Sequence, residues 1–464
     1  MGRMATQVAR FVSIDPATEE EIEAFDIARE SDVDRVLEAA ARAWRDWRWR
    51  PIGERATVLH AVAATLRREA EVHAATITAE MGKPLHEARA EVEKCAFCCD
   101  YFADEAPRLL ADERAPSDSP ASFVSFDPLG TLLACMPWNF PYWQVFRCIA
   151  PALMAGNCVV LKHASNTTRC GLRIEQALHE AGVPGGVFAM LVLPNDRVAD
   201  VIADSRVAAV SLTGSTAAGR SVATAAGQHV KKCVLELGGS DAFIVLADAD
   251  VAVAAETGVR SRFQNAGQSC ISAKRFIVHD AVADEFEDRL IQLSGELRVG
   301  DPKDAATQIG PLARADLRDT LVRQLRESVG RGARLRAGGD RVGDRGFYLQ
   351  PAVLTGCAPG MPAFDEETFG PLASVTRVGN DDEAVIMANH SEYGLGGNVW
   401  TRDLERGIAL AHRLDTGGVF VNGMTHSDPR IPFGGVRGSG YGRELHRFGI
   451  QEFVDIKTIW LPPA

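Results

Sequence analysis

The sequence has 464 residues, of which 46% are hydrophobic and 24% charged, and its formal net charge is −12. A chain of this length exceeds what one hydrophobic core usually supports, so two or three domains are expected. The acidic balance gives no electrostatic reason to expect nucleic acid or an anionic membrane as a partner.

The sequence also carries no sign of secretion or of a membrane span. No apolar run approaches the roughly 18 to 20 residues that cross a bilayer, and residues 1–24 contain no apolar signal region. The ten cysteines lack the spacing of a disulfide framework. They therefore predict reduced thiols in a cytoplasmic protein.

The first third of the chain has a helical pattern. Residues 29–110 are charged, rich in alanine and apolar with a period of 3.6, which predicts two or three amphipathic helices. One long helix is predicted over 72–106, and it contains Cys95, Cys98 and Cys99. A redox or zinc pair would need a strand-to-helix junction or a second Cys/His pair. These cysteines are therefore interpreted as buried helix residues.

From residue 130 the pattern changes to short apolar runs separated by helical segments, and it continues to residue 239. This alternation predicts a largely parallel sheet with helices on its faces, which is a nucleotide-binding architecture. A second α/β series runs from 242 to about 422, and a glycine-rich segment with a strand-like run ends the sequence.

Three residues at predicted strand–loop junctions have the types that oxidation of an aldehyde needs. A thiolate can attack a carbonyl, and the oxyanion that forms needs hydrogen-bond donors. Loss of hydride leaves a thioester, which a carboxylate-activated water can hydrolyse. Cys270, Asn139 and Glu236 could supply these functions.

Six motifs, in this order, resemble those of the aldehyde dehydrogenase superfamily, and the resemblance covers nearly the whole chain. They are residues 137–141 (PWNFP), 212–216 (LTGST), 236–239 (ELGG), 267–270 (GQSC), 367–371 (ETFGP) and 432–435 (PFGG).

The resemblance implies an α/β fold with a Rossmann-type NAD(P)-binding domain, an α/β catalytic domain and a small β oligomerisation arm. The cofactor domain would take residues 1–116 and 132–237, and the catalytic domain 238–434. The arm would take 117–131 and 435–464. Exposed edge strands in such an arm favour a homodimer or homotetramer.

The resemblance also implies the catalytic roles. Cys270 would be the nucleophile and Glu236 the general base for thioester hydrolysis. The Asn139 side chain and the Cys270 backbone N–H would form the oxyanion hole. No metal is expected in this mechanism.

The predicted cofactor site follows from a helix start and from the family pattern. Gly214 and Ser215 open a helix after a strand, where backbone N–H groups favour a phosphate. The position of Ser165 is often Glu in the family, and serine tolerates a 2′-phosphate that Glu would repel. The sequence therefore predicts NADP, with NAD as an alternative. The predicted cofactor residues are Trp138, Lys162, His163, Ala164, Ser165, Gly214, Ser215, Leu237, Glu367 and Phe369.

The predicted substrate residues are Arg147, Gln264 and Phe433. Arg147 lies eight positions after Asn139 and can face the substrate, where a guanidinium suits a distal carboxylate. The pattern resembles succinate-semialdehyde dehydrogenases. Some of these have a second arginine where Gln264 stands, and many have a lysine where Cys148 stands.

The sequence therefore predicts NAD(P)-dependent oxidation of succinate semialdehyde, or of a similar short ω-carboxy aldehyde, to the acid. Three alternatives remain open at this point. They are a dehydrogenase for an uncharged or other small aldehyde, a CoA-acylating aldehyde dehydrogenase, and a non-catalytic protein on the same fold.

Overall fold

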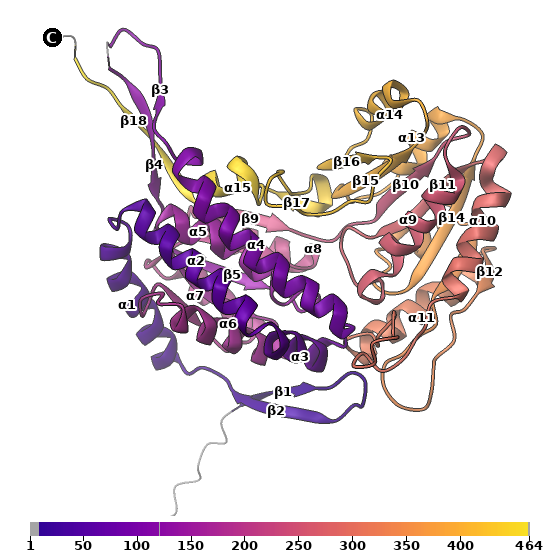
Figure 1. Cartoon of the computed structure of the whole chain (residues 1–464), viewed down its shortest axis with the longest axis horizontal. Coiled ribbons are helices and arrows are strands. Elements are labelled where there is room, and N and C mark those ends of the chain that lie inside the picture. Colours follow the sequence, from indigo (N-terminus) through magenta and orange to yellow (C-terminus); the bar gives the residue numbers. More distant parts are fainter. Residues whose placement is uncertain (1–8, 120, 463–464) are drawn as a thin grey trace, which may run out of the picture.

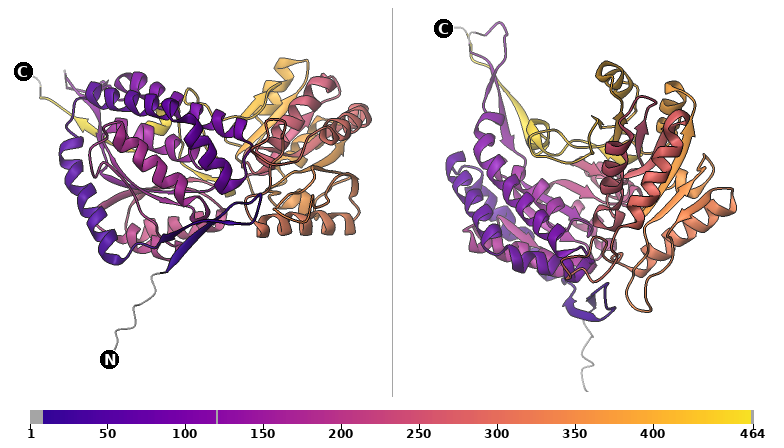
Figure 2. Two further views of the ribbon diagram at one scale, coloured as in Figure 1. Left: turned by 60° about the horizontal axis from the view of Figure 1, so that its bottom comes forward. Right: turned by 45° about the vertical axis from the view of Figure 1, so that its right-hand side comes forward.

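The computed structural model describes residues 9–119 and 121–462 of the chain. Two large β-sheets form the centres of two halves that lie side by side, the first half purple to magenta and the second orange in Figure 1. The turned views of Figure 2 show the same division. Within the described ranges, no helix is long and apolar enough to cross a membrane.

A β-hairpin and four helices begin the first half, and they differ from the prediction in two ways. The hairpin was not predicted, and the predicted helix over 72–106 is divided in two. The chain turns at Gly82, whose φ of 79° ends one helix, and Pro84 precedes the next. Cys95, Cys98 and Cys99 are buried free thiols, as predicted. The elements are β1 (Arg10–Ile14), β2 (Glu21–Asp26), α1 (Glu30–Trp47), α2 (Ile52–Arg68), α3 (Ala70–Met81) and α4 (Leu85–Leu109).

The first large sheet has six strands in the order β17-β9-β8-β5-β6-β7, parallel except for β17. The chain passes from β5 through β6 to β7, then returns to the other side of β5 with β8 and β9. Ligands of such sheets bind at this reversal, beyond the carboxyl ends of the strands. The strands are β5 (Thr131–Met136), β6 (Cys158–His163), β7 (Phe188–Met190), β8 (Val207–Thr213), β9 (Lys232–Glu236) and β17 (Gly440–Tyr441), and the helices α5 (Trp143–Ala155), α6 (Thr168–Glu180), α7 (Val198–Ala203) and α8 (Thr216–Gln228).

The second large sheet has seven strands in the order β12-β13-β14-β11-β10-β15-β16, parallel except for β12. Buried apolar side chains pack on both of its faces. Its strands are β10 (Asp241–Val245), β11 (Ala273–His279), β12 (Arg334–Ala337), β13 (Ala352–Thr355), β14 (Leu372–Val378), β15 (Gly396–Trp400) and β16 (Gly418–Val421). Its helices are α9 (Val251–Phe263), α10 (Asp280–Gly295), α11 (Ala315–Gly330), α12 (Pro362–Asp365), α13 (Asp381–Asn389) and α14 (Leu404–Ala411).

A three-stranded antiparallel sheet of β3 (Glu113–Arg114), β4 (Phe123–Pro128) and β18 (Val454–Ile459) projects from the first half (Figure 1). Before it reaches this sheet, the C-terminal segment forms β17 against β9 and then α15 (His446–Gln451). Residues 435–451 thus run across the first half before the arm begins. The predicted domain boundaries stay a prediction.

Candidate active site

Cys270 lies in the loop that joins α9 to β11, after a turn of unusual backbone conformation. Asn265, Ala266 and Gly267 are all left-handed, with φ of 55°, 52° and 72°. A Cβ at Gly267 would lie 2.3 Å from the carbonyl oxygen of Gly370, so only glycine fits. The Asn265 N–H donates to the Glu87 carboxylate at 3.0 Å. Such strained backbone is typical of functional loops.

Three cavities surround this loop. The cofactor cavity, of about 720 Å³, includes Trp138, Lys162, Ser165, Gly214 and Cys270 in its wall. The inner cavity, of about 80 Å³, includes Arg147, Cys270, Ser427 and Phe433. The outer cavity, of about 470 Å³, includes Lys83, Glu87 and Arg260. The inner and outer cavities share Lys94, Phe140, Trp143 and Gln264. The inner and cofactor cavities share Gln144 and Cys270.

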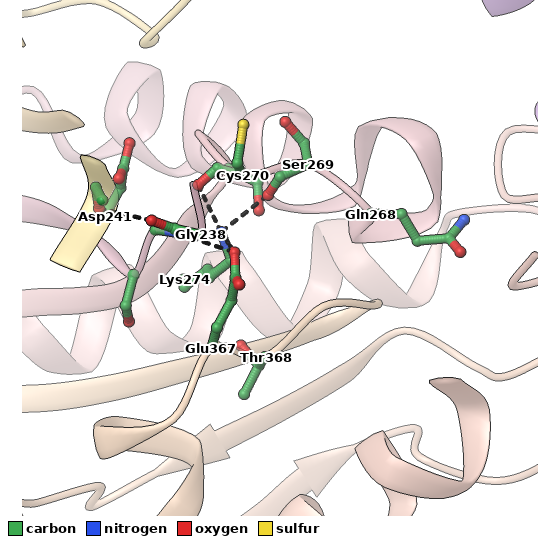
Figure 3. A network of polar contacts seen from close by, with 12 residues as sticks. Gly238, Asp241, Gln268, Ser269, Cys270, Lys274, Glu367 and Thr368 are labelled. Carbon is green, nitrogen blue, oxygen red and sulfur yellow. Dashed lines mark hydrogen bonds and ion pairs between the residues drawn. The ribbon is translucent and has the colours of Figure 1, made fainter. Parts of the chain in front are cut away.

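The main chain on either side of Cys270 is held by Lys274. Its Nζ donates to the carbonyl oxygens of Ser269 and Cys270 at 2.8 and 2.7 Å and lies 3.5 Å from Glu367 (Figure 3). Figure 3 also shows the Cys270 sulfur turned away from this network. Burial raises the pKa of the Cys270 thiol to about 12, against the opposing effect of Arg147 and Lys274. The thiol therefore has to lose its proton before it can act as a nucleophile.

Asn139 packs against the nucleophile loop. Its Nδ2 donates to the carbonyl oxygen of Gln268 at 3.1 Å, and its own carbonyl accepts from Asn265 Nδ2 at 2.8 Å. It lines the cofactor cavity together with Cys270. The amide is thus close to the loop it was predicted to assist, and its role in an oxyanion hole stays a prediction.

Glu236 ends β9 and is 2% exposed. Within residues 9–119 and 121–462, neither of its carboxylate oxygens has a hydrogen-bond partner. Burial raises the pKa of Glu236 to about 8; Arg147 opposes this shift and Glu444 adds to it. Glu236 is not in the wall of either cavity at Cys270. The Glu236 carboxylate therefore lies outside the walls of these two cavities, and its raised pKa makes it a stronger base than an exposed glutamate.

Arg147 lines the inner cavity from α5, but it already has a carboxylate partner. It is 2% exposed and forms an ion pair with Glu444, which is 0% exposed. Its Nη2 donates to Thr213 Oγ1 at 3.2 Å, and its guanidinium carbon lies 4.7 Å from the centre of the Phe433 ring. Burial opposes its charge, but the nearby carboxylates of Glu444 and Glu236 outweigh burial and raise the pKa of Arg147.

Sequence reasoning missed this ion pair. Glu444 follows the glycine-rich segment, and nothing in its spacing from Arg147 indicates that the two meet. The only available signal was indirect, since a buried arginine needs a partner. The predicted contact of Arg147 with a substrate carboxylate stays a prediction, now with a competing partner.

Nine of the ten predicted cofactor residues lie in the wall of the cofactor cavity: Trp138, Lys162, Ala164, Ser165, Gly214, Ser215, Leu237, Glu367 and Phe369. The tenth residue, His163, is not in that wall, and its contact with the cofactor stays a prediction. Its Nδ1 accepts from the Ala164 N–H at 2.8 Å and its Nε2 lies 2.8 Å from the Pro141 carbonyl. Burial lowers the pKa of His163 to about 4. The side chain is a neutral bridge behind the cavity.

The cavity suits a dinucleotide. It lies at the carboxyl ends of β5, β6 and β8, where the chain reverses direction. Ser215 caps α8, accepting from the Ala218 N–H at 3.2 Å, and the helix N-terminus favours a phosphate. Lys162 Nζ donates to Asn195 Oδ1, a neutral partner that leaves its charge available for a ligand. Sequence reasoning missed Asn195 and Arg314, which also line the cavity but belong to no recognised motif.

Residues 3–459 match the aldehyde dehydrogenase family, and the chain belongs to it. A relative from Escherichia coli (strain K12) named succinate semialdehyde dehydrogenase [NAD(P)+] is 45% identical over 455 residues, 98% of each chain. A Mycobacterium tuberculosis relative named succinate-semialdehyde dehydrogenase [NADP(+)] 1 is 46% identical over 452 residues, 97% of this chain and 99% of the relative.

Solved structures show the same fold. The succinic semialdehyde dehydrogenase of Streptococcus pyogenes in complex with NADP+ aligns with a TM-score of 0.96 and 39% identity, over 98% of this chain and 100% of that one. The structure of Gox0499, described for its cofactor and substrate selection, aligns with a TM-score of 0.96 and 40% identity, over 97% and 99%.

Proposed function

We propose that the chain oxidises succinate semialdehyde, or a similar short ω-carboxy aldehyde, to the carboxylic acid. NADP would be the hydride acceptor, with NAD as an alternative. The observation that carries this proposal is the position of Cys270, in the wall of both the cofactor cavity and the inner cavity. A substrate carbonyl at its sulfur would face a cofactor on the other side. The names of the relatives support the substrate and the cofactor.

The residues around Cys270 suggest the following roles. Its sulfur attacks the aldehyde, helped by Arg147 and Lys274, which favour the thiolate. Asn139 Nδ2 and the Cys270 N–H stabilise the oxyanion. The cofactor, when bound, accepts the hydride. Glu236, whose oxygens are free of hydrogen bonds in the described structure, activates the water that hydrolyses the thioester.

Ser165 supports the preference for NADP. It lies in the wall of the cofactor cavity with Lys162, and it puts no negative charge at that position. A ribose 2′-phosphate there could accept hydrogen bonds from the serine hydroxyl and the lysine ammonium.

A substrate panel with both cofactors tests the proposal. The purified protein should form NADPH with succinate semialdehyde. Its kcat/KM for succinate semialdehyde should be at least about tenfold higher than that for butanal, which lacks the carboxylate; a tenfold ratio corresponds to about 1.4 kcal/mol. Cys270→Ala should form no NADPH above background, because the covalent step is lost. NADPH formation by that variant would contradict the mechanism, and formation of acyl-CoA when CoA is added would favour the CoA-acylating alternative.

We also propose that the chain assembles as a homodimer or homotetramer in the cytoplasm. The projecting sheet of β3, β4 and β18 exposes Ile456, 67% exposed, near Trp460, 53% exposed. Exposed apolar residues on an edge strand are typical of an interface between copies. All ten cysteines are free, as in a reducing compartment. Light scattering after gel filtration tests the assembly, and a monomer mass would contradict it.

A further inference from the structure

The first turns of α4 direct two carboxylates at the segments that carry Asn139 and Cys270. Glu87 and Glu91 lie four residues apart, so they share one face of the helix, and both are in the wall of the outer cavity. Lys83, just before the helix, forms its ion pair with Glu91. Each carboxylate also accepts hydrogen bonds from the main chain of a different segment.

Glu91 holds the segment that follows Asn139. Its Oε1 accepts from the N–H groups of Tyr142 and Trp143, at 2.9 and 3.0 Å, where α5 begins. The first N–H groups of a helix have no partner within it, and a carboxylate there is favoured by the helix dipole. Glu91 therefore fixes the start of α5, three residues after Asn139.

Glu87 holds the turn that precedes Cys270. Both of its carboxylate oxygens accept from the Asn265 N–H, at 3.0 and 3.3 Å. Asn265 opens the run of three left-handed residues, and a side chain keeps such a backbone only where its surroundings impose it. A charged acceptor makes a stronger hydrogen bond than a neutral one. The Glu87 carboxylate is therefore suited to stabilise this turn.

Asn265 connects the turn to Asn139. Its Nδ2 donates to the carbonyl oxygens of Asn139 and Gln268, at 2.8 and 3.0 Å. The Gln268 N–H donates back to the Asn265 carbonyl oxygen at 3.0 Å. The turn that Glu87 holds therefore joins the main chain of Asn139 to a residue two positions before Cys270.

We propose that Glu87 is a positioning residue for the oxyanion hole. Its charged carboxylate fixes the Asn265 turn, and with it the relative positions of the Asn139 amide and the Cys270 N–H. This inference rests on the proposed attack of Cys270 on an aldehyde. Glu87 acts through Asn265 and takes no part in making or breaking bonds.

The electrostatics of the outer cavity make this role depend on pH. Burial raises the pKa of Glu87 to about 7; Lys83 and the Asn265 N–H oppose this shift and Glu91 adds to it. The carboxylate is therefore the stronger acceptor for the Asn265 N–H above neutral pH. Further charged or titratable groups in the wall of the outer cavity are His86 and Lys94 on α4, and Glu256 and Arg260 on α9.

Single-turnover rates test the role of Glu87. With the protein in excess over succinate semialdehyde and with saturating NADP, the rate of NADPH formation reports attack and hydride loss but not thioester hydrolysis. Glu87→Ala removes the acceptor and should slow this step about 10- to 100-fold at about pH 8, because a small displacement of the reacting groups is costly. Glu87→Gln keeps a neutral acceptor and should slow it only about two- to fivefold. Glu93→Gln, an exposed residue of the same helix, should leave the rate unchanged.

The pH dependence separates positioning by a charge from a general loss of structure. The rate of the unchanged protein divided by that of Glu87→Gln removes the ionisation of Cys270, which both proteins share. This ratio should be close to unity at about pH 6, where Glu87 is protonated, and should reach about two to five above about pH 8. The thermal unfolding midpoint and the dissociation constant of NADP should be the same in both proteins.

Two kinds of negative result are distinguishable. A normal rate in Glu87→Ala, or a ratio that does not change with pH, would overturn the role of Glu87; if Glu87→Ala does not fold, the ratio decides. Formation of NADPH by Cys270→Ala would instead overturn the proposed mechanism. Butanal replaces succinate semialdehyde in this test if the latter is not oxidised, so an error in the proposed substrate does not affect the result.

Discussion

The cofactor cavity and the two substrate-side cavities meet at one loop, but their walls come from different kinds of chain segment. The cofactor cavity is built mainly from turns that follow β5, β6, β8 and β9, neighbours in one parallel sheet. The inner cavity combines α4, α5, the Cys270 loop and residues 424–433. Parallel strands bring their carboxyl ends to one edge whatever lies elsewhere, whereas the inner cavity exists only after the two halves pack together.

The two sides also differ in how they treat charge. Lys162 on the cofactor side has a neutral partner, Asn195, and so keeps its charge for a ligand. On the substrate side, Glu444 neutralises Arg147 while Lys94 remains without a carboxylate in the described structure. The predicted ligand contacts of Lys162 and Arg147 therefore start from different situations, because only Arg147 already has a carboxylate partner.

The largest expected effect on activity is that of replacing Glu236, the proposed general base. Glu236→Gln should lower steady-state turnover about 10²- to 10⁴-fold, because the amide cannot activate water. Formation of NADPH should still occur once per site, since attack and hydride loss do not need this carboxylate. A rapid-mixing experiment should show the burst, and mass spectrometry should show an acyl group on Cys270.

The same residue predicts a pH profile. Because burial raises the pKa of Glu236 to about 8, the deprotonated and active fraction grows as the pH rises through 8. If thioester hydrolysis limits turnover, kcat should rise from pH 7 to 9 and then level off. Continued full-rate turnover by Glu236→Gln would assign the base to another group.

The second prediction concerns the ion pair behind the inner cavity. Arg147→Ala leaves Glu444 buried and unpaired, which should destabilise the fold by about 3 to 5 kcal/mol. Urea unfolding would measure the loss, and Arg147→Lys should lose less. The variant should lose similar activity on succinate semialdehyde and on butanal. A loss confined to the charged aldehyde would instead give Arg147 the carboxylate role that the sequence predicts.

The smallest effect is expected at the cofactor end. Ser165→Glu should lower kcat/KM for NADP at least about 30-fold, because a carboxylate would repel the 2′-phosphate. The value for NAD should change much less, since NAD carries a hydroxyl there. Initial rates with each cofactor at a saturating aldehyde concentration would measure both. Equal losses for NADP and NAD would show that Ser165 does not discriminate between them.

Much of the fold follows from local patterns, and the errors have identifiable causes. The strands and helices from β5 to β9 lie within residues 130–239, where the alternation of apolar runs and helical segments predicts them, because buried parallel strands are short apolar runs bounded by turns. The division between α3 and α4 depends on Gly82 and Pro84, a local signal that the continuous helical period obscured. β17 has only two residues and exists because it pairs with β9, which no local pattern could reveal.

The candidate site divides in the same way. Cys270, Asn139 and nine cofactor residues could be identified from their motifs, and all of them line the cofactor cavity. Asn139, Ser165 and Gly214 follow strands of the first sheet, so the sequence could also place them at one edge of that sheet. Cys270 precedes β11 and Glu367 precedes β14, so only the packing of the two halves brings them there. His163 belongs to the same predicted segment as Ser165, but its side chain turns inward and its ring contacts the Pro141 carbonyl. The direction of a single side chain depends on its neighbours in space, so the motif alone could not separate His163 from Ser165.

The sequence by itself determined the chemistry: a cysteine in a glycine-containing turn, a carboxylate at a strand end and a serine in place of an acid at the cofactor. Each depends on residue type and local backbone. Only the tertiary structure decided how the buried charges pair, Arg147 with Glu444 and Lys83 with Glu91, while Lys94 has no carboxylate partner among the described residues. Pairing depends on distances across the packed core, and the low dielectric there makes each choice of partner decisive.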